Sequence, residues 1–130
     1  SWDEVLEATA RQSRGTNLPP GRVRADYLLA EVDGQVVGRT SIRYDLTEHL
    51  LRVGGHVGYG VGPAFRRRGY ATEILRQSVG RLNAAGVERV LVTCADDNAA
   101  SAATIEACGG VLENVVPDGD GRPTRRYWIG

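Results

Sequence analysis

The stretch of sequence best suited to do chemistry runs from Pro63 to Ala71, where three successive arginines stand directly before a glycine. A strand pattern precedes these arginines and a helical pattern follows them, so the turn leads into the N-terminus of a helix. The free backbone N–H groups and the positive dipole end of such a terminus bind anions. Gly69 allows the backbone to approach a phosphate closely, and Ala71 is small for the same reason. The turn therefore predicts a phosphate site, and a solvated basic loop is the alternative interpretation.

Two familiar phosphate-binding loops do not fit this turn. A Walker loop requires a lysine, and the chain contains none, because all 16 of its basic residues are arginine. The dinucleotide fingerprint requires a glycine at position 63 or 65, where the chain has Pro63 and Phe65. If the turn binds a phosphate, it does so outside these two motifs.

Composition narrows the classes of protein and partner. The length of 130 residues predicts one domain, and a share of 42% hydrophobic and 25% charged residues is ordinary for a globular fold. Sixteen basic and 16 acidic residues give a net charge of zero, which argues against binding to nucleic acid or to an anionic membrane. Cys94 and Cys108 form no CxxC pair, so we expect neither a metal site nor a disulfide. No apolar run has membrane-spanning length, and we expect a cytoplasmic protein.

The elements expected around the turn include both strands and helices. Trp2, Val5 and Leu6 lie at helical spacing and predict a helix over residues 2–13. Asp33-Gly34 between two β-rich runs predicts a hairpin over residues 26–44. The other expected elements are a short helical turn within 45–55, strands at 56–62, 87–95, 111–116 and 124–130, and helices at 71–86 and 99–110. This order is typical of a mixed α/β domain with a central sheet.

The arginine turn resembles the acetyl-CoA pyrophosphate loop of the GNAT superfamily of N-acetyltransferases, which has the pattern R-x-x-G-x-A. Arg66, Gly69 and Ala71 carry that pattern here, and residues 90–110 resemble the next strand and the Asn-led helix of the family. Residues 52–75 and 105–114 are similar to a bacterial subgroup of predicted acetyltransferases. The resemblance covers about four fifths of the chain, residues 25 to 129. It implies one domain over 1–130 with a mixed, mostly antiparallel central sheet flanked by helices, and a V-shaped splay between strands at about 56–61 and 89–95.

The resemblance also implies a role for each matching position. Backbone groups around Tyr59, Gly60 and Val61 match the strand edge that pairs with the pantetheine arm and polarises the thioester carbonyl. Asn98, with Ser101 one turn later, matches an asparagine that touches the cofactor arm, and plain helix capping accounts for Asn98 equally well. The positions that match the pyrophosphate cradle are Arg66, Arg67, Arg68, Gly69, Tyr70, Ala71 and Thr72.

The chain departs from the family at one catalytic position. Many members carry a tyrosine seven residues after that asparagine, which protonates the departing thiolate, and this chain has Ile105 there. His56 and Tyr59 lie on the strand expected to face the thioester and are the candidate catalytic residues. His56 is a candidate general base because the unperturbed pKa of histidine lies near neutral pH. A structural histidine and a packed tyrosine ring are the alternatives.

The resemblance implies an N-acetyltransferase that moves an acetyl group from acetyl-CoA to a primary amine of a small molecule or peptide, by direct attack on the thioester. A CoA-binding sensor without catalysis is the alternative that Ile105 leaves open, and an RNA-binding protein is disfavoured by the zero net charge. The family's first strand and helix have no match in this sequence, so we expect a shortened domain. Such a domain exposes a sheet edge, which predicts homodimer formation by strand pairing.

Overall fold

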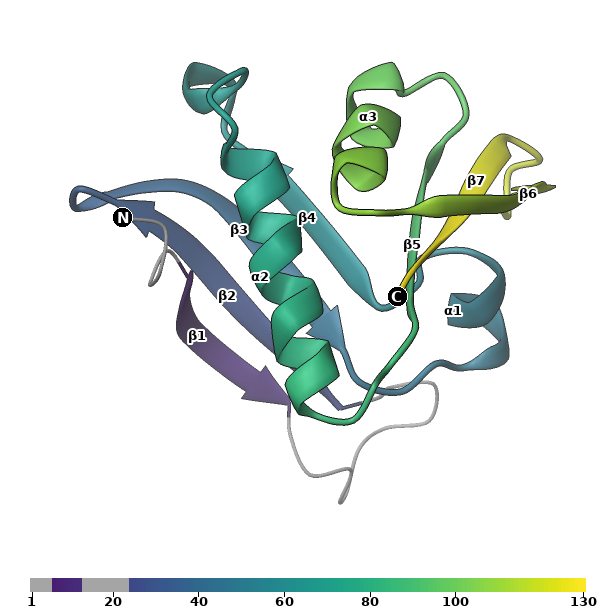
Figure 1. Cartoon of the computed structure of the whole chain (residues 1–130), viewed down its shortest axis with the longest axis horizontal. Helices are drawn as coiled ribbons and strands as arrows, with labels where there is room; N and C mark the ends of the chain where they lie inside the picture. The colour runs from purple at the N-terminus through teal and green to yellow at the C-terminus, as the bar shows by residue number, and fades with distance from the viewer. Residues whose placement is uncertain (1–5, 13–23) are drawn as a thin grey trace.

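The computed structural model describes residues 6–12 and 24–130. These residues form a four-stranded sheet in the order β1-β2-β3-β4 and a three-stranded sheet in the order β5-β7-β6, with α2 against the larger sheet and α3 beside the smaller one (Figure 1). The elements are β1 (Leu6–Gln12), β2 (Ala25–Val32), β3 (Gln35–Arg43), α1 (Glu48–Arg52), β4 (Val57–Val61), the 3-10 turn Pro63–Phe65, α2 (Tyr70–Ala84), β5 (Val90–Ala95), α3 (Ala99–Ala107), β6 (Val111–Pro117) and β7 (Pro123–Ile129). All strand pairs are antiparallel, which confirms the predicted mixed α/β fold class.

The predicted hairpin is confirmed. β2 and β3 pair in antiparallel register around a two-residue turn, in which Asp33 and Gly34 both adopt positive φ values of 52° and 80°. Two positive φ values in succession are the signature of a type I′ turn, and Asp-Gly is a preferred sequence for it. The turn fixes the register of β3, and β3 in turn carries β4, Val57–Val61, beside it.

The prediction of a helix over residues 2–13 is wrong for residues 6–12. These residues form β1, which pairs antiparallel with β2. Their sequence, Leu-Glu-Ala-Thr-Ala-Arg-Gln, alternates apolar or small residues with polar ones, so over so short a stretch it fits the two-residue period of a strand as well as a helix. When residues 6–12 are extended, their backbone N–H and C=O groups form hydrogen bonds with the edge of β2. Residues 2–5 and 13 of the predicted helix lie outside the described residues.

β4 and β5 are neighbours that belong to different sheets. Gly55 forms an isolated antiparallel bridge with Val92, and next to it the His56 N–H donates to the Leu91 carbonyl oxygen at 2.8 Å. After this bridge β4 pairs with β3 and β5 pairs with β7, and the two strands separate toward α3 (Figure 1). One edge of β4 therefore faces β5 without a ladder between them.

Helix α2 covers the four-stranded sheet through one apolar stripe. Ile74, Leu75 and Leu82 are fully buried at helical spacing, as the periodicity of the sequence predicts. Ser78 lies on the same stripe, where its hydroxyl bonds the Ile74 carbonyl oxygen at 2.7 Å and the Thr40 hydroxyl of β3 at 3.0 Å. Each buried hydroxyl thus has a partner, and α2 is fixed against β3.

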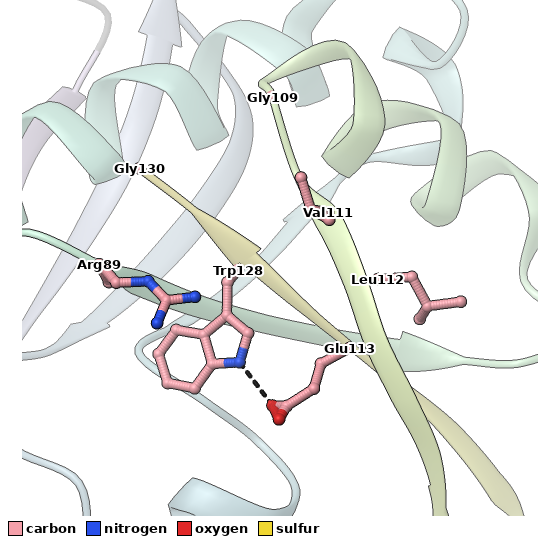
Figure 2. A pocket seen from close by; sticks show the side chains of 7 residues that line it. All are labelled: Arg89, Gly109, Val111, Leu112, Glu113, Trp128 and Gly130. Atoms are coloured by element: carbon pink, nitrogen blue, oxygen red, sulfur yellow. Dashed lines mark hydrogen bonds between the residues drawn. The ribbon is translucent and has the colours of Figure 1, made fainter.

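The three-stranded sheet holds a polar cluster on the face that α1 approaches. The Arg126 guanidinium donates to the Leu51 carbonyl oxygen at 2.8 Å and to Glu113 at 2.7 Å, which ties α1 to β6 and β7. The Trp128 indole N–H donates to the same Glu113 carboxylate at 2.6 Å, and the Arg89 guanidinium lies 4.9 Å from the indole ring centroid (Figure 2). A cavity of about 580 Å³ lies beside Trp128, and Arg89 and Glu113 form a polar part of its wall.

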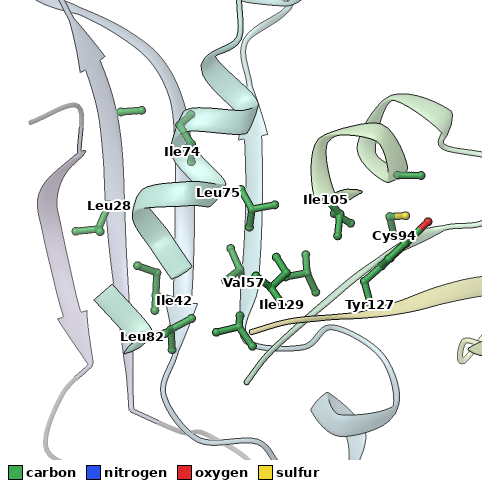
Figure 3. Close-up of a cluster of buried hydrophobic side chains, with 14 of the residues drawn as sticks. Leu28, Ile42, Val57, Ile74, Leu75, Leu82, Cys94, Ile105, Tyr127 and Ile129 are labelled. Atoms are coloured by element: carbon green, nitrogen blue, oxygen red, sulfur yellow. The ribbon is translucent and has the colours of Figure 1, made fainter. Parts of the chain in front are cut away.

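One hydrophobic core joins the two sheets. Leu28 and Ile42 come from the larger sheet, Ile105 from α3, and Tyr127 from the smaller sheet (Figure 3). The Tyr127 ring is 1% exposed, while its hydroxyl donates to Glu106 at 2.8 Å. Burial of apolar surface is the main stabilising contribution here, so the core holds β4, α2 and α3 at fixed positions around the turn that leads into α2.

Candidate functional site

A cavity of about 680 Å³ lies where the end of β4, the arginine turn, the start of α2 and the start of α3 meet. Three separate segments of the sequence therefore contribute to one concave site. Its lining residues are Tyr59, Gly60, Val61, Phe65, Arg66, Arg67, Gly69, Tyr70, Ala71, Thr72, Asn98, Ala100, Ser101 and Thr104. The structure thus brings together every candidate catalytic and cofactor-binding residue except His56 and Arg68, which do not line the cavity.

The floor of the cavity includes the uncapped N-terminus of α2. Gly69 is the N-cap residue with φ of 81°, and no side chain among the described residues caps this terminus. A Cβ on Gly69 would meet no atom within 4 Å, so the space in front of the backbone is open. The first N–H groups of α2 have no partner within the helix, which makes this terminus an anion site of the predicted kind.

Arg67 holds the arginine turn in a strained shape. Its φ of 64° lies in the left-handed region. Among the described residues, Arg67 and Asp33 are the only ones other than glycine with a positive φ. A left-handed residue with a Cβ costs about 1–2 kcal/mol, and such strain persists where the surrounding structure or a function requires it. No pattern in the sequence predicts this conformation of Arg67.

Replacing Arg67 with glycine removes this strain and tests its cause. We expect the melting temperature of Arg67→Gly without ligand to stay level or rise slightly, because relief of about 1–2 kcal/mol of strain offsets the larger entropy of glycine in the unfolded chain. Thermal unfolding of the variant beside the wild type checks this. A clear fall in melting temperature would mean that the Arg67 side chain stabilises the turn in the absence of any anion.

Tyr59 crosses from β4 to α3 inside the cavity. Its hydroxyl is 3.0 Å from the Ser101 hydroxyl, and either oxygen can be the donor. Burial raises the pKa of Tyr59, and the Ser101 hydrogen bond only partly opposes this rise. The phenol is therefore protonated at neutral pH and has a proton to donate.

Asn98 caps α3 and also lines the cavity. Its side-chain oxygen accepts a hydrogen bond of 3.1 Å from the Ser101 N–H, as a helix N-cap residue does. The capping interpretation is thereby confirmed, and the location of Asn98 on the cavity wall is also compatible with contact to a ligand. Ile105, at the position where many family members have tyrosine, is fully buried in the core.

His56 lies beneath the junction of the two sheets and is 6% exposed. Its Nδ1 accepts a hydrogen bond of 2.9 Å from the Leu91 N–H, and the backbone N–H of His56 donates to the Leu91 carbonyl oxygen. Burial lowers the pKa of His56 below its ordinary value of 6.5. These contacts join β4 to β5, so the structure places His56 in a supporting position away from the cavity.

The burial of neutral His56 makes stability depend on pH. Because the folded pKa lies below the unfolded one, the unfolded chain takes up a proton first as the pH falls below about 6.5, and the free energy of unfolding decreases. His56→Ala should cost about 1–3 kcal/mol at neutral pH, since it leaves the buried Leu91 N–H without its acceptor. In His56→Asn the amide oxygen replaces Nδ1, so this variant should be less destabilised and should lose the pH dependence. Urea unfolding at pH 5 and pH 8 checks these expectations. An unchanged stability in His56→Ala would contradict the supporting role.

Sequence reasoning missed three lining residues, Phe65, Ala100 and Thr104. Thr104 could have been predicted, because it lies three residues after Ser101 on the same face of a predicted helix. Phe65 follows Pro63 in a turn that carries no periodic signal, and Ala100 has no functional group to single out.

Residues 6–12 and 24–130 contain neither a candidate metal site nor a membrane-spanning helix. This part of the chain has no group of three His, Cys, Asp or Glu residues that could hold a metal ion. None of its helices is both long and apolar enough to span a membrane. The cavity beside Trp128 contains none of the residues predicted from the sequence to act in function.

Comparisons with known proteins bear on the family and the fold of this chain. The family model described as an acetyltransferase (GNAT) domain matches residues 2–111. The structure of the microcin C7 self-immunity acetyltransferase MccE, solved with acetyl-CoA and AMP, is 24% identical with a TM-score of 0.64, and the match covers 80% of this chain and 59% of that one. The ribosomal L7/L12 alpha-N-protein acetyltransferase RimL with coenzyme A is 21% identical with a TM-score of 0.65, covering 80% and 60%. An acetyltransferase from Bacillus subtilis with CoA is 9% identical with a TM-score of 0.68, covering 81% and 76%.

These similarities differ in what they show. At identities below 25% the solved structures show that the fold is shared. The chain spans about three fifths of the length of MccE and RimL.

Proposed function

Because this chain belongs to the GNAT acetyltransferase family, we propose that it binds acetyl-CoA in the cavity between β4, α2 and α3 and transfers the acetyl group to a primary amine. The observation that carries this proposal is the uncapped N-terminus of α2, which opens into that cavity beside three arginines. The CoA pyrophosphate is the part of the donor that fits such a site.

The arginine turn suits an anion in two ways. Its backbone offers N–H groups in a fixed direction, and Gly69 leaves the space in front of them open. Arg66, Arg67 and Arg68 are exposed, and none of the ion pairs found within residues 24–130 includes them. Their charges are therefore available to a phosphate, and each well-formed contact would contribute about 1.5–3 kcal/mol.

The proposed reaction is direct attack on the thioester. The lone pair of the neutral amine forms the new C–N bond, and the C–S bond breaks as the tetrahedral intermediate collapses. The backbone N–H of Tyr59 would stabilise the oxyanion, because alternate N–H groups of β4 point away from β3 and that edge of β4 has no ladder partner among the described residues. The Tyr59 hydroxyl would give its proton to the coenzyme thiolate, and the proton released by the amine goes to solvent.

The experiment that tests this function is a screen for acetyl-CoA consumption over amines, amino acids, peptides and aminoglycosides, run beside a CoA-binding assay. We expect free CoA and an N-acetylated product of the expected mass from at least one acceptor. Binding of CoA without turnover of any acceptor would instead indicate a sensor that uses the fold without its chemistry.

The homodimer expected from the sequence remains part of the proposal. In the strand order β1-β2-β3-β4, β1 has a partner among the described residues on one side. Sedimentation at several protein concentrations checks this expectation, and a strictly monomeric protein at high concentration contradicts it.

A further inference from the structure

The two faces of the four-stranded sheet differ in composition. One face packs against α2 and the hydrophobic core, and the opposite face contains arginine side chains. Thr40 and Ile42 of β3 are buried against α2 and the core, so the alternate residues Arg39, Ser41 and Arg43 lie on the other face. The register places Arg39 opposite Gly60 and Ser41 opposite Gly58 on β4. We call this surface the arginine face; it consists of Tyr27, Leu29, Arg39, Ser41, Arg43, Gly58 and Gly60.

The two glycines keep the β4 side of the arginine face flat and accessible. A Cβ on Gly60 would meet no atom within 4 Å, so the surface beside Arg39 is open. A Cβ on Gly58 would lie 3.2 Å from Nη2 of Arg43, which shows that the guanidinium lies directly over the β4 backbone. Tyr59, between these glycines, points to the opposite side and lines the cavity. β4 therefore separates the proposed CoA site from the arginine face by the thickness of one strand.

Arg43 is half-buried, and no carboxylate of the described residues forms an ion pair with it. Its Nη1 donates to the carbonyl oxygens of Gly54 and Gly55 at 3.2 and 3.1 Å, and these are its only side-chain hydrogen bonds to the described residues. None of the ion pairs in that part of the chain includes Arg43. Burial lowers the pKa of its guanidinium, so the charge is held there at a cost. Buried charges in proteins are normally paired, and an anionic ligand is the partner that this geometry leaves room for.

The position of Arg43 relates this anion site to the proposed reaction. Gly55, whose carbonyl oxygen holds the guanidinium, is also the residue that bridges to Val92 of β5. Arg43 therefore lies where the segment before β4 meets β5, and its Nη2 lies beside the β4 edge at Gly58, one residue before Tyr59. A carboxylate bound there would hold the amine of the same molecule close to that edge.

We propose that the acceptor is a primary amine that also carries a carboxylate, and that Arg43, assisted by Arg39, binds this carboxylate on the arginine face. This inference rests on the proposed acetyl transfer and names its substrate class. The planar guanidinium matches a carboxylate with two parallel hydrogen bonds, and Nη2 and Nε are the groups that can form them. Its positive charge also favours the neutral form of a nearby amine, which is the form that attacks.

The test compares amines that differ only in the carboxylate. Glycine, β-alanine, 4-aminobutyrate and a set of L-amino acids are assayed as acceptors beside their carboxamides, with wild type, Arg43→Gln, Arg39→Gln and Arg81→Gln. Arg81 lies in the last turn of α2 and serves as the control for loss of a positive charge. We expect the wild type to prefer the carboxylates by about 10- to 100-fold in kcat/KM, the size of a charge-assisted contact. Arg43→Gln should remove most of this preference through KM, Arg39→Gln should reduce it, and Arg81→Gln should preserve it.

A binding arm keeps the inference falsifiable without turnover. The N-acetylated forms of the same amino acids, as reaction products, should raise the melting temperature of the CoA-bound wild type, and their carboxamides should not. Acetylation of amines without a carboxylate preference overturns this inference and leaves acetyl transfer intact. Carboxylate binding that requires Arg43, without transfer to any amine, supports the anion site and overturns the proposed function. If Arg43→Gln fails to fold, the inference is tested by the preference of the wild type for carboxylates over carboxamides and by the reduction of that preference in Arg39→Gln.

Discussion

Replacing Gly69 with glutamate is expected to abolish the stabilisation of the fold by CoA. At about one hundred times its dissociation constant, a ligand of the native state adds roughly 2.7 kcal/mol to the free energy of unfolding, which is a rise of several degrees in melting temperature. A glutamate at position 69 adds bulk and a like charge where the pyrophosphate would lie. An acidic residue at a helix N-terminus suits the dipole of α2, which partly offsets the strain of its positive φ. Thermal unfolding with and without CoA measures the effect.

Two further variants separate the causes. Gly69→Gln has the same bulk without the charge, so it should recover part of the CoA shift that Gly69→Glu loses. Arg66→Ala should weaken CoA binding only several-fold, because backbone N–H groups supply much of the contact. If Gly69→Glu folds normally and still shows the full CoA shift, the arginine turn is a charged surface loop.

Replacing Tyr59 with phenylalanine is expected to lower kcat by about 100-fold or more, within the range for loss of a general acid. The ring still fills its place between β4 and α3, so acetyl-CoA affinity and stability should change little. Pre-steady-state measurement of thiol release checks the chemical step directly. An unchanged kcat would mean that the ring only packs and that the thiolate leaves unaided.

The pH dependence gives an independent test of the same role. The acid must be protonated to act, and burial raises the pKa of Tyr59 above its ordinary value of 10.0. Activity from this group should therefore persist to alkaline pH and decline only above about 10, and that decline should be absent in Tyr59→Phe. Ser101→Ala removes the hydrogen bond that opposes the raised pKa and should move the decline to still higher pH. A decline near neutral pH that Tyr59→Phe removes would be inconsistent with the environment of this phenol.

The cavity could be predicted from the sequence because its chemistry is carried by backbone and by local signals. Each of these signals can be recognised from a few neighbouring residues. The change from strand to helical period at Gly69 predicts a turn before a helix, and Asn98 predicts the N-terminus of the next helix. That these segments meet in one site was implied by the resemblance to the GNAT superfamily. The structure adds that Tyr59 and Ser101 touch across the cavity, a contact between residues 42 positions apart.

Long-range packing decided what the sequence could not show. The ordinary pKa of a histidine side chain made His56 a candidate general base. Only the contact between the segment before β4 and β5 reveals that its Nδ1 accepts a hydrogen bond from the Leu91 N–H. The segment at residues 6–12 fits two periods, and the free edge of β2 selects the strand. Arg43 has no ion pair with any described residue, and this depends on residues distant in the sequence that no local pattern reveals.

A crystal structure with bound acetyl-CoA is the measurement that tests the central claim most directly. The account predicts the pyrophosphate within hydrogen-bonding distance of backbone N–H groups between Arg67 and Thr72, and the thioester sulfur beside the Tyr59 hydroxyl. Acetyl-CoA bound in the cavity beside Trp128, or bound with its pyrophosphate away from the arginine turn, would contradict it.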